Sequence, residues 1–155
     1  MNADTHHFLL TPNAWLGEGK IQLNMVEEEL AFVTRWKIGP KDESGKIECL
    51  QEIQVKGLSE VMLNQFLLYD LTPGTFVIDL DNPALGKVTG TGIINDKVIA
   101  WEFRAPDVGF EGFEFYEKES PESYTMRAEY ATSDQFRTTI KGKVWKQVLP
   151  AGPTT

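Results

Sequence analysis

The sequence is poor in the residues from which many catalytic and metal sites are built. Its 155 residues include one cysteine, Cys49, and two histidines, His6 and His7. A single cysteine cannot form a disulfide within the chain. Adjacent histidines without further ligands make a weak chelate, so we expect a flexible polar N-terminus here rather than a metal site. Cys49 shares an alternating face with Ile47 and Ile53, which predicts a small buried core residue.

Long apolar runs and an excess of basic residues are also missing. No apolar stretch approaches the roughly 20 residues that a membrane-spanning helix needs. The first residues have neither the basic start nor the apolar run of a secretory signal peptide. Lys and Arg number 15 against 23 Asp and Glu, and the resulting net charge of −8 disfavours binding to phosphate backbones and anionic membranes. We therefore expect a soluble cytoplasmic protein with no nucleic-acid or membrane partner.

Short stretches of alternating apolar and polar residues are abundant. About ten of them follow one another between Trp15 and Trp145, with turn-forming residues at almost every junction. Residues 61–71 could instead form a buried helix, but the neighbouring patterns and the Thr72-Pro73-Gly74 stop favour a strand. Asn95-Asp96 separates two strand patterns and predicts a two-residue hairpin with left-handed backbone conformation.

The short connections between consecutive strands predict the architecture. We expect an all-β fold, namely a closed up-and-down antiparallel barrel of about ten strands, because closure removes the exposed strand edges. A barrel wider than about eight strands commonly encloses a ligand cavity. The barrel domain is expected over residues 14–148, between an N-terminal extension (1–13) and a flexible C-terminal tail (149–155).

The opening of the first strand resembles a known family. Trp15-Leu16-Gly17-Glu18-Gly19 is similar to the G-x-W-x-G-x-G opening of the nitrobindin-like family, a member of the calycin superfamily with the lipocalins and fatty-acid-binding proteins; Asn13 replaces the first glycine. The resemblance implies a ten-stranded barrel with an apolar pocket, which in nitrobindins holds a haem through a late histidine. No histidine occurs in the second half of this chain, so we expect neither haem nor another cofactor.

The candidate ligand-binding residues lie mostly on apolar strand faces that are expected to meet inside the barrel. They are Trp36, Trp101, Phe103, Arg104, Tyr124, Met126 and Tyr130. Arg104 shares a face with Glu102, so this pair could orient a polar ligand head; alternatively both lie outside while Trp101 and Phe103 point inward. The fatty-acid-binding Arg-x-Tyr pair is absent, because Arg127 and Tyr130 are three residues apart and point to opposite faces.

Three functions remain open at this point. The leading hypothesis is a barrel that binds a small apolar or amphipathic molecule without catalysis. The first alternative is a barrel with a filled core that acts through its outer surface or as a homodimer. The second is a cofactor-free isomerase or lyase. Carboxylate pairs such as Glu111 and Glu114 match no recognisable catalytic arrangement, but an inward-facing cluster of titratable residues with perturbed pKa values would support an enzyme.

Overall fold

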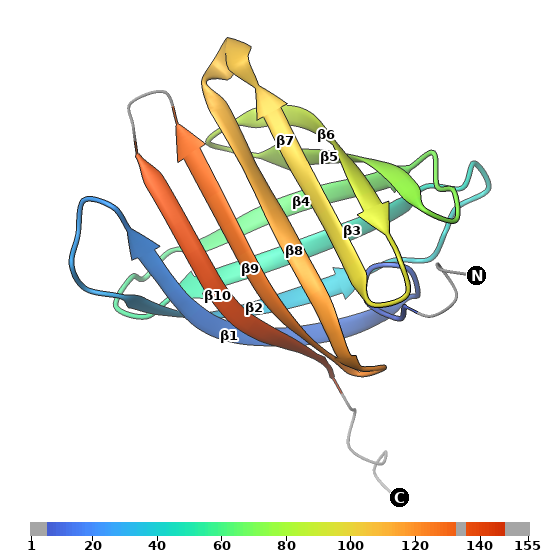
Figure 1. Cartoon of the computed structure of the whole chain (residues 1–155), viewed down its shortest axis with the longest axis horizontal. Coiled ribbons are helices and arrows are strands. Elements are labelled where there is room, and N and C mark those ends of the chain that lie inside the picture. The colour runs from blue at the N-terminus through green and yellow to red at the C-terminus, as the bar shows by residue number, and fades with distance from the viewer. Residues whose placement is uncertain (1–5, 133–135, 148–155) are drawn as a thin grey trace, which may run out of the picture.

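The protein is a closed barrel of ten antiparallel strands (Figure 1). The computed structural model describes residues 6–132 and 136–147. Each strand pairs with the next one along the chain, and the last returns to pair with the first, which confirms the predicted fold class. The strands are β1 (Asn13–Leu23), β2 (Leu30–Ile38), β3 (Ile47–Val55), β4 (Val61–Tyr69), β5 (Thr75–Asn82), β6 (Gly86–Ile94), β7 (Val98–Ala105), β8 (Phe110–Ser120), β9 (Ser123–Thr132) and β10 (Arg137–Lys146).

Helical structure is a minor part of the fold. A short 3₁₀ turn, η2 (Pro106–Val108), connects β7 to β8. None of the helical turns in the described part of the chain is long and apolar enough to span a membrane. The segment that could have been a buried helix is strand β4, as predicted, because pairing with both β3 and β5 satisfies its backbone.

The hairpin between β6 and β7 is present, but its predicted left-handed conformation is wrong. Among the described residues other than glycine, only Leu9 and Asp70 have positive φ. The side chain of Asn95 makes the turn instead, since its Oδ1 accepts hydrogen bonds from the backbone N–H groups of Lys97 and Val98 at 3.0 and 2.9 Å. Asparagine side chains often replace a backbone acceptor in this way. The main-chain carbonyl of Asn95 is therefore available to another part of the protein.

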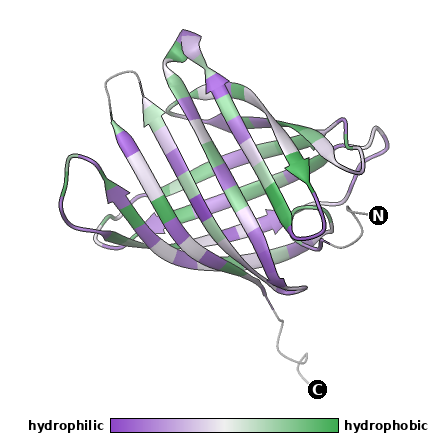
Figure 2. Ribbon diagram, viewed as in Figure 1, coloured by the Kyte–Doolittle hydropathy of each residue, from purple (hydrophilic) through white to green (hydrophobic). Residues whose placement is uncertain are grey.

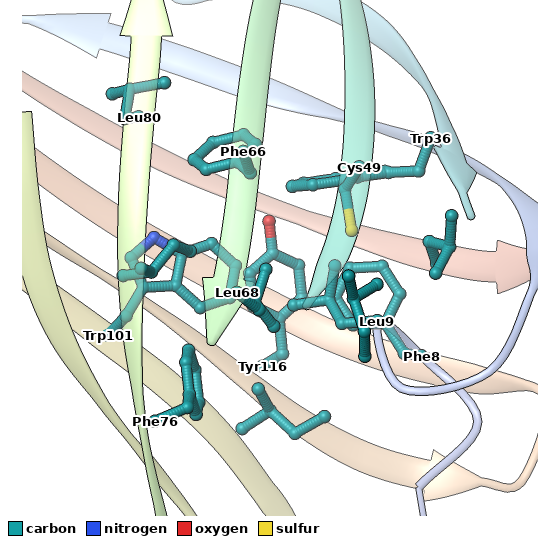
Figure 3. Packing of buried hydrophobic residues seen from close by; sticks show 14 of the residues in the cluster. Phe8, Leu9, Trp36, Cys49, Phe66, Leu68, Phe76, Leu80, Trp101 and Tyr116 are labelled. Carbon is teal, nitrogen blue, oxygen red and sulfur yellow. The ribbon is translucent and has the colours of Figure 1, made fainter. Parts of the chain in front are cut away.

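Apolar residues alternate with polar ones along the strands, so the ribbon is banded in Figure 2. The inward-facing aromatic side chains pack closely in one half of the barrel (Figure 3). Trp36 stacks on Phe66 with ring centroids 5.3 Å apart, and Trp101 stacks on Tyr116 at 5.2 Å. Cys49 is buried in the same cluster, as predicted. This half of the barrel is a filled core.

The N-terminal segment completes that core. Phe8 and Leu9 are fully buried, and the Phe8 ring lies 4.7 Å from the ring of Tyr116 and 5.4 Å from that of Trp36. Aromatic rings in such tilted and edge-to-face contacts stabilise one another beyond the area they bury. Residues 6–12 therefore fill one end of the barrel, beside the β6–β7 connection (Figure 1).

His6 fixes the segment in place. Its side chain is buried, and both ring nitrogens have partners: Nδ1 lies 2.7 Å from the Tyr124 hydroxyl, and Nε2 contacts the carbonyl oxygen of Asn95. Because a carbonyl only accepts, Nε2 donates its proton to Asn95 and the neutral ring accepts from Tyr124 at Nδ1. The prediction of a flexible polar terminus is wrong for His6, because the neighbouring Phe8 packs in the aromatic core and holds the segment there.

Glycine permits the barrel to close tightly between β1 and β10. A Cβ atom on Gly19 would lie 2.1 Å from the backbone oxygen of Lys141, and one on Gly142 would lie 2.3 Å from that of Glu18. Both distances are far below van der Waals contact, so no larger residue fits without moving the strands. The close approach of β1 and β10 thus explains why Gly19 of the Trp15-Leu16-Gly17-Glu18-Gly19 opening is a glycine.

Candidate functional site

The half of the barrel away from the N-terminal segment is hollow. A cavity of about 390 Å³ lies there, and its mouth includes Leu58 and Met62, whose side chains are about half exposed. Its walls are mostly apolar, as is usual for small-molecule sites. The apolar wall residues include Ile21, Phe32, Ile53, Val55, Leu80, Phe110, Met126, Ile140 and Val144.

A carboxyl group held by two tyrosines lies in this cavity. Glu114 is 5% exposed, and its Oε1 accepts a hydrogen bond of 2.7 Å from the Tyr116 hydroxyl. Its Oε2 accepts a hydrogen bond from the hydroxyl of Tyr130. All three side chains line the cavity. We call them the Glu114 cluster.

Strand register and small neighbours position the Glu114 cluster. Glu114 and Tyr116 lie on the same face of β8 because they are two residues apart. Ala128 of β9 is opposite Glu114, and Gly112 is opposite Tyr130. A Cβ atom on Gly112 would lie 2.2 Å from Cδ1 of Tyr130, so the missing side chain makes room for the tyrosine ring. Its hydroxyl can then reach the carboxyl on the neighbouring strand.

The electrostatics of the cluster follow from its burial. Burial raises the pKa of the Glu114 carboxyl, and the hydrogen bonds from Tyr130 and Tyr116 partly oppose this shift. Burial and the charge of Glu114 raise the pKa values of both tyrosines well above their ordinary value. The phenols therefore stay protonated and act as donors, while the carboxyl is more readily protonated than a solvent-exposed one.

Three amide side chains form a second polar group on the opposite wall. Asn64 Nδ2 donates to Oε1 of Gln51 at 3.0 Å, and Asn82 Nδ2 donates to Oδ1 of Asn64 at 3.1 Å. They belong to β3, β4 and β5, which lie across the barrel from β8 and β9 in the strand order. The cavity thus has apolar walls with one acidic and one neutral polar region facing each other.

The seven residues singled out from the sequence divide into three groups. Met126 and Tyr130 line the cavity. Trp36, Trp101, Phe103 and Tyr124 are buried inside the barrel but do not line the cavity. Arg104 lies on the outer surface, where its Nη2 is 3.7 Å from Oε2 of Glu102, as the alternative with outward charges predicts.

Glu114 and Tyr116 were not predicted as site residues. Phe113 and Phe115 flank Glu114, so the local pattern suggests that the phenylalanines face inward; instead Phe113 is 39% exposed. Only the register of β7 and β8 would have identified Glu114, since it is opposite Trp101 and shares its inward face. Such a residue-by-residue register could not be assigned from the apolar pattern alone.

The cavity does not fit a haem held in the nitrobindin manner. Its lining includes neither histidine nor cysteine, and His6 lies in the filled end with both ring nitrogens engaged. No group of three or more His, Cys, Asp or Glu side chains in the described ranges is arranged to hold a metal ion.

Solved structures with a similar barrel exist. The S-type phycobiliprotein lyase CPES from Guillardia theta superposes with a TM-score of 0.67 at 10% identity, over 90% of this chain and 89% of that one. The protein EF1p2_mFAP2b bound to DFHBI superposes with a TM-score of 0.51 at 14% identity, over 92% and 98%. No family model and no curated protein sequence matches this chain. At these identities the likeness establishes a shared barrel fold.

Proposed function

We propose that this protein binds a small, apolar or amphipathic molecule in the cavity and does not transform it. The observation that carries this proposal is the hollow half of the barrel, about 390 Å³ with mostly apolar walls and a few polar groups. A barrel that served only as a structural or interaction module would gain stability by filling this volume, because an apolar void costs free energy.

The similar structures support the first part of this proposal, the binding of a small molecule. One of them is a barrel bound to DFHBI, and the other is a phycobiliprotein lyase. We infer from the fold and from the buried Trp15 with its following glycines that the chain is a nitrobindin-like barrel. We further propose that its ligand is not a haem held through histidine or cysteine, since the cavity offers no imidazole or thiolate to the iron.

Binding of Nile red, a neutral dye whose emission responds to polarity, tests the proposal. The dye should bind the wild-type protein with enhanced fluorescence. Ile140→Phe should weaken its binding by about tenfold or more, because the larger ring occupies the cavity. Lys141→Phe is the matched control, since Lys141 is the exposed neighbour on β10. Equal dye binding by both variants would place the dye outside the barrel and contradict the proposal.

A cofactor-free isomerase or lyase is a second candidate, and the Glu114 cluster favours it. A buried carboxyl with a raised pKa beside two phenols is the kind of group that transfers protons in enzymes. Native mass spectrometry of copurified ligand distinguishes the two functions. The same molecule in wild-type protein and in Glu114→Gln indicates binding alone. A product in the former and its isomer or precursor in the latter indicates catalysis.

A further inference from the structure

We infer that the ligand carries a cationic nitrogen, such as a protonated amine, which binds the Glu114 carboxylate at the floor of the cavity. This inference rests on the proposed function and specifies its ligand class. The opposite class, molecules that end in a carboxylate, should be rejected.

The charges inside the cavity support this assignment. Among the described residues that line it, the titratable side chains are Glu114, Tyr116, Tyr130 and Lys143. The Lys143 ammonium lies outside, because its side chain is 65% exposed and its Nζ is 3.9 Å from Oε1 of Glu119. The inward-facing lining of the described residues thus contains an acid without a compensating base. A buried carboxylate without a basic partner is unfavourable, and a bound cation would supply that partner.

The geometry of the carboxyl leaves room for such a partner. Each carboxylate oxygen has about two acceptor positions. Tyr116 occupies one on Oε1, and Tyr130 occupies one on Oε2. The two hydroxyls hold the carboxylate in one orientation, and the remaining positions can accept N–H groups. A preoriented, partly desolvated acceptor makes strong charge-assisted hydrogen bonds.

The charged residues around the mouth of the cavity also favour a cationic ligand. The connections at this end that the structure describes in full are residues 24–29, 56–60, 83–85 and 106–109. These four connections contain one basic residue, Lys56, and five acidic residues, namely Glu27, Glu28, Glu29, Glu60 and Asp107. Two arginines near the rim are paired, Arg104 with Glu102 and Arg137 with Glu129. The negative potential raises the local concentration of cations and repels anions.

Binding has a defined proton balance. Where Glu114 is protonated in the free protein, its proton must pass to solvent when an ammonium group binds, leaving the carboxylate paired with the cation. A neutral ligand requires no such release. The described groups that face Glu114 from the neighbouring strands and across the cavity are neutral. They are the phenol of Tyr130, the thioether of Met126, the indole of Trp101 and the amides of Gln51 and Asn64.

Three ligands with the same alkyl chain test the inference: decylamine, decanol and decanoate, each competing with Nile red near neutral pH. Wild-type protein should bind decylamine about tenfold or more tightly than decanoate, with decanol between them. Glu114→Gln should abolish this order while Nile red still binds. Glu111→Gln is the matched control, because Glu111 is on the same strand but exposed, and it should keep the wild-type order.

The outcomes separate this inference from the proposed function. If decanoate binds wild-type protein as tightly as decylamine, or if Glu114→Gln keeps the preference, the inference is overturned although the cavity binds ligands. If neither Nile red nor any decyl compound binds, both the inference and the proposed function are overturned.

Calorimetry of the wild-type protein tests the same inference without a variant. At pH values where Glu114 is protonated in the free protein, titrations in buffers of different ionisation enthalpy should show proton release with decylamine and none with decanol. Equal proton release with the two ligands there would contradict the inference.

Discussion

The hydroxyl of Tyr116 lies 2.7 Å from Oε1 of Glu114, and both side chains point from β8 into the cavity. Tyr130 binds the other oxygen from β9. Two donors thus hold a carboxyl group that has no cation beside it among the described residues. We expect its protonation to affect the free energy of unfolding.

Glu114 should make the protein less stable at high pH. Burial raises its pKa above the ordinary value of 4.5, so its contribution to stability is complete below that value and is lost as pH rises through the folded-state pKa. Glu114→Gln removes the charge, and the tyrosine hydroxyls can rotate to suit the amide. The variant should be more stable than the wild type at about pH 8, and the difference should shrink towards about pH 5. Urea unfolding followed by tryptophan fluorescence measures this.

Glu111→Gln serves as the control for this prediction, because an exposed carboxyl on the same strand should leave the pH dependence of unfolding unchanged. A Glu114→Gln protein that loses the same stability at both pH values would show that Glu114 acts only through its hydrogen bonds.

His6 should have the opposite pH dependence. Burial lowers its pKa below 6.5, although the hydrogen bond to Asn95 partly opposes this. The unfolded chain therefore takes up a proton first, and stability should fall as pH decreases below about 6.5. His6→Gln should reduce this slope between about pH 7.5 and 5.5, with His7→Gln as the exposed control. Identical slopes for wild type and His6→Gln would exclude a contribution from His6.

Phe8 should be one of the more important residues for stability, although it precedes the first strand. Its ring is fully buried between Trp15, Trp36, Tyr116 and Tyr124. Phe8→Ala should lower the free energy of unfolding by about 3 to 5 kcal/mol, the usual range for a buried phenylalanine. His7→Ala, at an exposed neighbouring position, should change it by less than about 0.5 kcal/mol. Similar values for the two variants would mean that the segment contributes little to the core.

The barrel could be predicted from the sequence because its signal is repeated in every strand. Turn residues mark the junctions, and even the ambiguous segment 61–71 follows its neighbours as β4. The inward side of Trp101 and Phe103 was also predictable, because burying Glu102 and Arg104 instead would have been costly.

The site could be predicted only in part, since it depends on relations between strands. Tyr130 and Met126 stood out as members of an apolar face, but Glu114 became recognisable only through its pairing with Trp101 and Ala128. The cavity depends on which half of the barrel the N-terminal segment fills. Nothing in the polar start of the chain indicates that Phe8 would pack against side chains more than a hundred residues later.

The filling of one end by Phe8 and Leu9 has a kinetic consequence for any ligand that reaches Glu114. A ligand of the cationic class inferred above must pass the mouth with its charged group leading, and it must withdraw that group last when it dissociates. The charged group loses its water before it reaches the carboxylate. The bound ligand should therefore have a long residence time.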